Sequence, residues 1–252
     1  VRHTARPKGA ERWEFALLKR SFCDHKPGGG QSGLGRIETS TLAQSVYNEL
    51  RWALTGGVFV PGQAVSLRML ADQLGTSVMP VRQAINHLIT EGGLAMMPNR
   101  TVIVPRMTRA RFVELNRIRE LLESEAGARA CGNLTQGQRE QLVNTNLELQ
   151  QCLERGEIKG ALAANRDFHF RLYEASAMPT LVQMIGALWL QIGPFLHLSI
   201  SDPLMPWDGG RHDEVLAALA ARDAQAARRA IEQDVVLTAR AFLAADRHFD
   251  QS

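Results

Sequence analysis

Apolar side chains recur with helical spacing in the segment that follows residue 39. The first helix carries four of them at intervals of four residues: Leu42, Val46, Leu50 and Leu54. Two shorter helices with the same pattern are predicted after Ser66 and Ser77, each of which can cap the helix that it precedes. Residues 94–97 and 101–104 favour β-structure on either side of a Pro-Asn-Arg turn, so they predict a hairpin.

This order of elements predicts a DNA-binding motif. Two amphipathic helices joined by a short turn that contains Gly75 are typical of a helix-turn-helix. The hairpin that follows the second of these helices makes the motif winged. In such motifs the second helix lies in the major groove of DNA, and the residues at its N-terminus meet the base edges. Residues 39–105 are therefore predicted to form a winged helix-turn-helix DNA-binding domain.

The rest of the chain, residues 106–252, has helical spacing almost throughout. Its apolar stripes run through Phe112, Leu115, Arg119 and Ala126; through Leu142, Thr145, Leu149 and Cys152; through Leu162, Asn165, His169 and Leu172; through His212, Val215 and Leu219; and through Ala227, Ala230, Ile231 and Asp234. About six helices with short connections indicate a helical bundle. The predicted fold class is mainly α, with an N-terminal winged helix-turn-helix and a C-terminal all-α helical bundle.

The charge distribution adds a third segment. Residues 1–38 carry eight Lys and Arg against four Asp and Glu, and they include the run Pro-Gly-Gly-Gly-Gln-Ser-Gly. We expect a flexible basic N-terminal extension there, suited to contact with DNA phosphates. The chain as a whole is 45% hydrophobic and 22% charged, which is an ordinary soluble composition.

Two further features bear on where the protein works. The three cysteines are too few and too scattered for a disulfide framework, which favours the cytoplasm. Residues 175–201 contain no charged side chain and are long enough to cross a bilayer. They include Gln, His, Pro, Ser and Thr, so we expect a helix buried in the bundle and no membrane partner.

Polar residues on the apolar faces of the bundle point to a binding site. His169, His212 and Asp234 lie on three different predicted helices, each among apolar neighbours, and Asn165 is one turn before His169. Buried polar groups are costly unless they are paired. Two imidazoles and a carboxylate in one cavity are suited to a divalent metal such as Zn, Ni or Mn. Two separately hydrogen-bonded histidines and a buried acid explain the same pattern, and the sequence leaves both interpretations open.

The run from Leu67 to Val104 resembles the DNA-binding domain of the GntR superfamily of bacterial regulators. The matching elements are Leu70-Ala71, Leu74-Gly75, Ser77, Pro80-Val81-Arg82, Ala84, Leu88, Glu91-Gly92 and Pro98-Asn99-Arg100. The resemblance implies DNA contacts at Arg68, Ser77, Met79, Arg82, Asn99 and Arg100. Two positions depart from the family pattern, which has Arg where Val78 stands and Glu where Gln83 stands. The loss of that Arg removes a candidate guanine reader, so the operator is expected to differ or to be read partly by apolar contact.

The helical half resembles the ligand-binding (FCD) domain of the FadR-type branch of this superfamily. The resemblance rests on the runs RIRELLESEAG at 117–127, NRDFHFRLYEAS at 165–176 and RHDEVLAALAARDAQAARRAI at 211–231. It implies metal ligands at Asn165, His169, His212 and Asp234, two of which differ from the family's residue types. Arg119 corresponds to a position that holds the effector in such domains. On its own helix, however, it can equally pair with Glu123.

Together these features predict a cytoplasmic, homodimeric transcriptional regulator and not an enzyme. It binds a near-palindromic double-stranded DNA operator through residues 39–105. Residues 106–252 dimerise and bind a small carboxylate effector, through the divalent metal if one is held. The main alternative is a metal-dependent hydrolase on the helical domain, but no positioned nucleophile or general base accompanies the histidines. A second alternative is a structural nucleic-acid-binding protein without a ligand, which the buried polar cluster disfavours.

Overall fold

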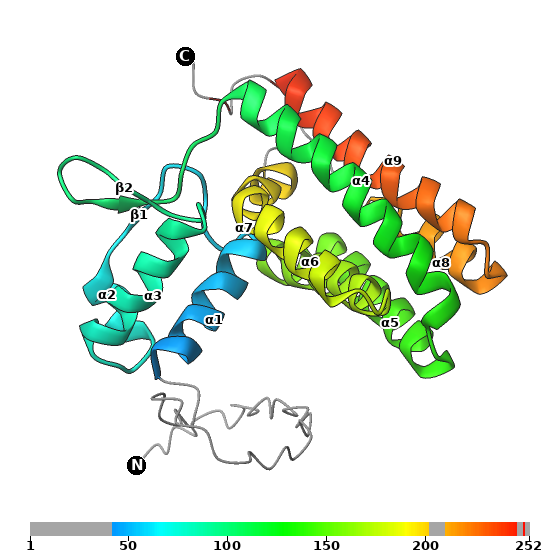
Figure 1. Ribbon diagram of the computed structural model, residues 1–252, viewed down its shortest axis with the longest axis horizontal. Coiled ribbons are helices and arrows are strands. Elements are labelled where there is room, and N and C mark those ends of the chain that lie inside the picture. The colour runs from blue at the N-terminus through cyan, green and yellow to red at the C-terminus, as the bar shows by residue number, and fades with distance from the viewer. Residues whose placement is uncertain (1–41, 202–209, 246–248, 250–252) are drawn as a thin grey trace, which may run out of the picture. The chain divides into compact units, whose positions relative to one another are not determined.

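The computed structural model describes residues 42–201, 210–245 and 249. These belong to one compact unit, Ser40–Ser252, and the remaining unit is Val1–Thr39. The expected basic extension, residues 1–38, therefore lies outside the described residues. Within them the chain forms nine helices and three short strands (Figure 1).

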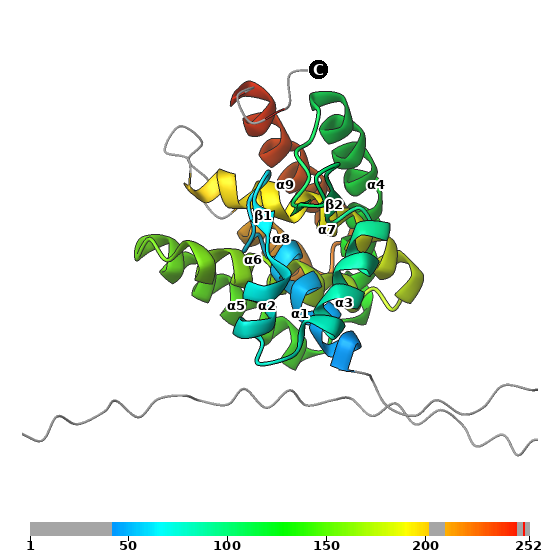
Figure 2. The ribbon, with the colours of Figure 1, turned by 90° about the vertical axis from the view of Figure 1, so that its left-hand side faces the viewer.

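The first part of the described chain has the elements of a winged helix-turn-helix. They are α1 (Leu42–Thr55), β1 (Ala64–Val65), α2 (Leu67–Gln73), α3 (Val78–Thr90), β2 (Ala95–Met96) and β3 (Val102–Ile103). Ser66 caps α2, its hydroxyl oxygen accepting a hydrogen bond from the Met69 amide at 3.4 Å. Ser77 has the extended backbone of an N-cap before α3, without a side-chain capping bond. Figure 2 turns these elements toward the viewer.

The apolar stripes predicted from the sequence form the core of this domain. Val46, Leu50 and Leu54 of α1 pack with Val81, Ile85 and Leu88 of α3. Leu42, at the start of the predicted stripe, is 60% exposed and does not belong to this core. The predicted hairpin is present as β2 and β3, and Arg100 in its turn has a φ of 64°.

The sheet has a strand that the sequence pattern did not reveal. β1 pairs antiparallel with β3, so the strand order is β1-β3-β2. Ala64 lies opposite Ile103, and Val65 opposite Val102. The wing is thereby anchored to the segment just before α2.

Six helices make up the second part of the described chain. They are α4 (Arg109–Asn133), α5 (Gln136–Glu154), α6 (Ile158–Glu174), α7 (Pro179–Ser201), α8 (His212–Ala221) and α9 (Ala224–Ala245). α4 packs along α9, and α5 packs along α6 (Figure 1). Thr135 begins α5 with a full capping box, in which its side chain and that of Gln138 bond each other's backbone.

The charge-free segment forms α7 from Pro179 onward, and its apolar character is explained by burial. Among the described residues this helix, over Pro179–Ser199, is the one long and apolar enough to cross a membrane by length and composition. Trp189, Ile192 and Phe195 are nevertheless almost fully buried in the core of the helical half. The expectation of a core helix therefore fits the structure.

The end of α1 meets α7 at very short range. A Cβ atom at Gly193 of α7 would overlap the backbone carbonyl oxygens of Leu54 and Thr55, so only glycine fits there. The Nδ1 of His197 lies 3.1 Å from the carbonyl oxygen of Gly57. This contact ties the last turn of α1 to a helix that also lines the site described next.

Candidate functional site

A small cavity lies between helices of the second half. The volume of this cavity is about 20 Å³, enough for about one water molecule. Polar and apolar side chains from α4, α6, α7 and α9 line it: Arg119, Leu162, Asn165, His169, Trp189, Leu196, Ser199, Asp234, Val235 and Thr238.

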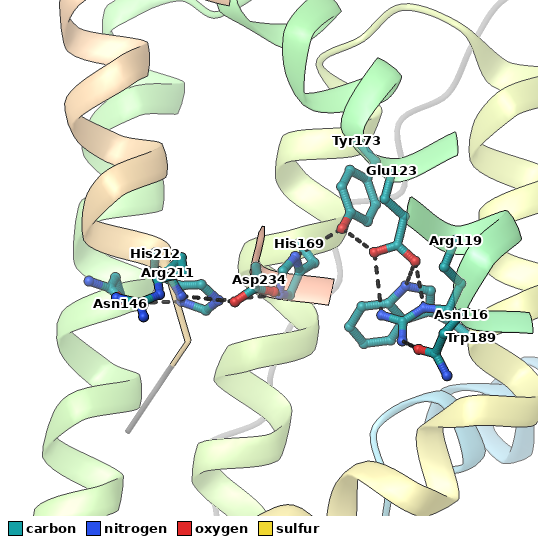
Figure 3. Close-up of polar contacts among 10 residues, drawn as sticks. All are labelled: Asn116, Arg119, Glu123, Asn146, His169, Tyr173, Trp189, Arg211, His212 and Asp234. Carbon is teal, nitrogen blue, oxygen red and sulfur yellow. Dashed lines mark hydrogen bonds and ion pairs between the residues drawn. The ribbon is translucent and has the colours of Figure 1, made fainter. Parts of the chain in front are cut away.

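Three of the residues predicted as metal ligands converge: His169 and Asp234, which line this cavity, and His212, which does not line it. One potential ligand atom from each of His169, His212 and Asp234 lies within 4.8 Å of the other two. The Nε2 atoms of the two histidines are 3.2 Å apart, and Nε2 of His169 is 3.5 Å from Oδ2 of Asp234 (Figure 3). The side chains come from α6, α8 and α9, so the cluster exists only in the folded chain.

The fourth predicted residue, Asn165, is one turn before His169 on α6. It is buried and lines the same cavity. Its Oδ1 has no hydrogen-bond partner among the described residues. A buried amide oxygen without a partner is costly, so this atom is available to a ligand in the cavity.

Burial keeps both imidazoles in the form that binds metals. Removal from water, together with the smaller effect of the positive charge of Arg119, lowers the pKa of His169 to about 3. Burial likewise lowers the pKa of His212 to about 3, with a smaller contribution from His169. Both rings are therefore neutral near pH 7, as a metal ligand must be.

The second nitrogen of each imidazole has its own partner. Nδ1 of His169 is 2.9 Å from Oη of Tyr173, and Nδ1 of His212 is 3.1 Å from Oδ1 of Asn146. The ring of His212 also stacks on Phe168, with the ring centroids 3.9 Å apart. These contacts fix the orientation of both rings.

Asp234 is held by the backbone at the start of α8. Its Oδ1 accepts a hydrogen bond from the amide of Arg211 at 2.8 Å, which leaves Oδ2 toward His169. Gly210 has a φ of 73°, and a Cβ atom there would overlap the carboxylate of Asp234. A glycine is thus required for this carboxylate to approach the chain so closely.

Arg119 faces the cavity and also pairs with Glu123, so both arrangements left open by the sequence occur together. Its Nε donates to Oε1 of Glu123 at 2.7 Å, and its Nη1 donates to Oδ1 of Asn116 at 3.0 Å. Glu123 is fully buried and also accepts hydrogen bonds from Trp189 Nε1 at 2.9 Å and Tyr173 Oη at 2.6 Å (Figure 3). The pKa of Tyr173 is raised well above 10, first by burial and then by Glu123.

Sequence reasoning missed several members of this cluster. The sequence pattern indicates Glu123 only as a partner for Arg119, and it assigns no polar role to Tyr173 or Trp189. Asn146 was not considered at all, although it lies four residues after Leu142 and so shares the buried face of α5. A search for polar residues on apolar stripes, extended to this helix, would have found it.

The six residues predicted to contact DNA all lie on the surface of the winged domain: Arg68, Ser77, Met79, Arg82, Asn99 and Arg100. They come from α2, the start of α3 and the wing. Met79 is 62% exposed in the first turn of α3, although it is a large apolar residue. Oδ1 of Asn99 accepts a hydrogen bond from the Thr101 amide at 3.1 Å, so this side chain shapes the turn.

A winged helix-turn-helix joined to an all-α domain is the architecture of a DNA-binding transcriptional regulator. The chain belongs to the GntR family of bacterial regulatory proteins: the profile of that family matches residues 42–104, and the profile of the FCD domain matches residues 114–236. The chain is accordingly a transcriptional regulator and not an enzyme, so the hydrolase alternative is without support.

Individual relatives agree with this assignment. The chain is 34% identical over 205 residues to the HTH-type transcriptional regulator McbR of Escherichia coli K12, covering 80% of this chain and 92% of McbR. It is 28% identical to a probable D-xylose utilization operon transcriptional repressor of Paenarthrobacter nicotinovorans, over 84% of this chain and 92% of the repressor. The solved structure of E. coli McbR/YncC superimposes with a TM-score of 0.72, covering 81% of this chain and all of that one.

Proposed function

We propose that this regulator is a cytoplasmic homodimer whose DNA binding is controlled by a small carboxylate effector through a divalent metal. Residues 39–105 form the DNA-binding domain, and residues 106–252 form the effector and dimerisation domain. The metal is held by Asn165, His169, His212 and Asp234. The observation that carries the proposal is the convergence of two imidazole nitrogens and a carboxylate oxygen on one buried point.

The donor atoms fit a divalent transition metal. Tetrahedral ligands at about 2.05 Å from a zinc ion are about 3.3 Å from one another, and the two Nε2 atoms are 3.2 Å apart. The unpartnered Oδ1 of Asn165 offers a further ligand atom. Two neutral imidazoles, a carboxylate and an amide suit Zn, Ni or Mn. A metal bound there supplies positive charge for an anionic effector.

The effector site lies beside the metal ligands. Arg119 lines the same cavity and supplies the second positive charge, while Leu162, Leu196 and Val235 supply an apolar wall. A compact carboxylate would satisfy both kinds of surface. Because Arg119 is already bonded to Glu123, such an effector must share or take over the guanidinium.

Arg166 provides a direct contact between the effector side and the DNA-binding domain. It follows Asn165 on α6, and its Nε donates to Oγ1 of Thr55 at the end of α1 at 2.9 Å. Its guanidinium lies 5.7 Å from the ring centroid of Trp52, also in α1. A movement of α6 at Asn165 would reach the winged domain through this contact, which supports control of DNA binding by the effector.

The first test of this function combines metal analysis with a screen of small carboxylates. Purified full-length protein is expected to contain a divalent metal, and a carboxylate that raises its melting temperature is expected to alter its affinity for operator DNA. A metal-free protein that no carboxylate stabilises would contradict the proposal.

Arg82→Ala is expected to weaken operator binding by about 1–3 kcal/mol, because Arg82 is exposed near the start of the recognition helix α3. Operator affinity is measured by fluorescence anisotropy with a DNA fragment that the wild-type protein selects from a pool of random sequences. Arg129→Ala removes an equally charged side chain, 63% exposed on α4, and should leave the affinity unchanged. Equal affinities for both variants and the wild type would remove Arg82 from the interface.

Tight operator binding is expected to require two copies of the chain, because one winged domain covers only a half-site. Sedimentation of the protein with DNA should give two chains on a near-palindromic operator and much weaker binding to an isolated half-site. A monomer that binds one half-site as tightly as the full operator would exclude the homodimer.

A further inference from the structure

Every buried imidazole nitrogen in the candidate metal site faces a polar atom. Which nitrogen of each ring carries the proton therefore decides which nitrogen has a lone pair to bind a metal. We propose that Tyr173 and Asn146 are positioning residues that hold the protons of His169 and His212 on Nδ1 and so leave both Nε2 lone pairs for the metal. This inference rests on the proposed metal site and adds the groups that prepare it.

The proton of His212 follows from the contacts of Asn146. Nδ2 of Asn146 donates to Oδ1 of Asp213 at 2.8 Å, which turns Oδ1 of Asn146 toward the imidazole. That amide oxygen can only accept a hydrogen bond, so Nδ1 of His212, at 3.1 Å, must carry the proton. A neutral imidazole has one proton, and Nε2 of His212 is therefore a lone pair.

The proton of His169 follows from the contacts of Glu123. Arg119 and Trp189 donate to Oε1 of this carboxylate, and Tyr173 donates its only hydroxyl hydrogen to Oε2 at 2.6 Å. The hydroxyl of Tyr173 is then an acceptor toward Nδ1 of His169 at 2.9 Å. Nδ1 of His169 accordingly donates to it, and its Nε2 is also a lone pair.

The outcome is a set of three acceptors that point at one another. The two Nε2 lone pairs, 3.2 Å apart, and the Asp234 carboxylate, 3.5 Å from one of them, repel unless a positive charge lies among them. A divalent metal is a ligand of that charge and size. A chain of hydrogen bonds also connects the effector site to one of the metal ligands. It runs from Arg119 through Glu123 and Tyr173 to His169, and we call it the relay.

Zinc titration of the full-length protein tests the relay, with metal affinity as the readout. Tyr173→Phe should weaken zinc binding by about 10–100-fold, the usual effect of losing a hydrogen-bond partner of a metal ligand. The matched control is Tyr47→Phe, which removes the chain's other tyrosine hydroxyl and its 2.6 Å hydrogen bond to Glu91, within the winged domain. This control should bind zinc as the wild type does.

Asn146→Ala tests in the same way whether Asn146 positions the proton of His212. Its control is Asn144→Ala, which changes an exposed residue of α5. It also serves if Tyr173→Phe fails to fold. A wild type that binds zinc together with folded Tyr173→Phe and Asn146→Ala variants of unchanged affinity overturns this inference and leaves the proposed function standing. A wild type that binds none of zinc, nickel and manganese overturns both.

Nitrogen-15 spectra of the zinc-loaded wild type give a readout that a merely structural role would not move. We expect a slowly exchanging Nδ1–H proton on both His169 and His212. In Tyr173→Phe only the Nδ1–H proton of His169 should exchange faster with water. In Asn146→Ala only the Nδ1–H proton of His212 should do so. A proton on Nε2 of either ring in the wild type would overturn the assignment, whatever the variants do.

Discussion

Replacing Glu123 by alanine is expected to lower the free energy of unfolding by about 3–5 kcal/mol, the usual cost of breaking a buried ion pair by removal of one partner. Arg119 is only 4% exposed and Glu123 is fully buried. Without the carboxylate, the guanidinium keeps its charge inside the protein, and Trp189 and Tyr173 lose their acceptor. Chemical denaturation of the full-length protein measures the change.

The control for this prediction lies two residues further along α4. Glu125 pairs with Arg129 and Arg228, but its side chain is 30% exposed, so Glu125→Ala should cost less than about 1 kcal/mol. Replacing both Arg119 by Met and Glu123 by Leu should recover much of the lost stability, because the guanidinium is then not left buried without its partner. A cost for Glu123→Ala as small as that for Glu125→Ala would contradict the importance given to this pair.

His212→Ala is expected to weaken metal binding by more than about 100-fold, since loss of a ligand costs more than the 10–100-fold loss of its hydrogen-bond partner. The affinity of the metal-free protein for operator DNA should stay within about twofold of the wild type. His212 and the residues proposed to read DNA lie in different domains, so the effector response should disappear while DNA binding remains.

Isothermal titration with zinc and anisotropy with operator DNA separate these two effects. Glu214→Ala changes an exposed residue on the same helix, α8, and should alter neither measurement. A His212→Ala variant that still binds zinc at wild-type affinity would remove His212 from the metal site. A variant that loses DNA binding in the absence of metal and effector would contradict the separation of the two functions.

The sequence was sufficient for the helices because each is specified locally. The stripe through Val46, Leu50 and Leu54 and the capping Ser66 act within one or two turns, and the structure has them as predicted. β1 could not be found in this way. Its two residues, Ala64 and Val65, have no alternating pattern, and they form a strand only because β3 is brought beside them from almost 40 residues away.

The candidate site was predictable as far as helical faces allow. His169 and Asn165 share a face of α6, and the positions of His212 and Asp234 among apolar residues indicated burial. That all these helices meet at one point is a property of packing, which helical periodicity does not specify and which the family resemblance implied. The role of Tyr173 depends on the direction of its hydroxyl, which no periodicity reveals.

The small size of the cavity has a consequence for the apparent affinity of the regulator for its effector. A space of about 20 Å³ admits about one water, whereas metabolite pockets are commonly hundreds of Å³. The conformation described is therefore closed to an organic effector, and side chains such as Leu196 or Val235 must first move aside. The apparent affinity for the effector is then its intrinsic affinity multiplied by the fraction of open molecules, so an open population of about 1% weakens it about 100-fold. The sensitivity of this regulator to its effector thus depends on the fraction of molecules that are open as well as on the contacts between the open protein and the effector.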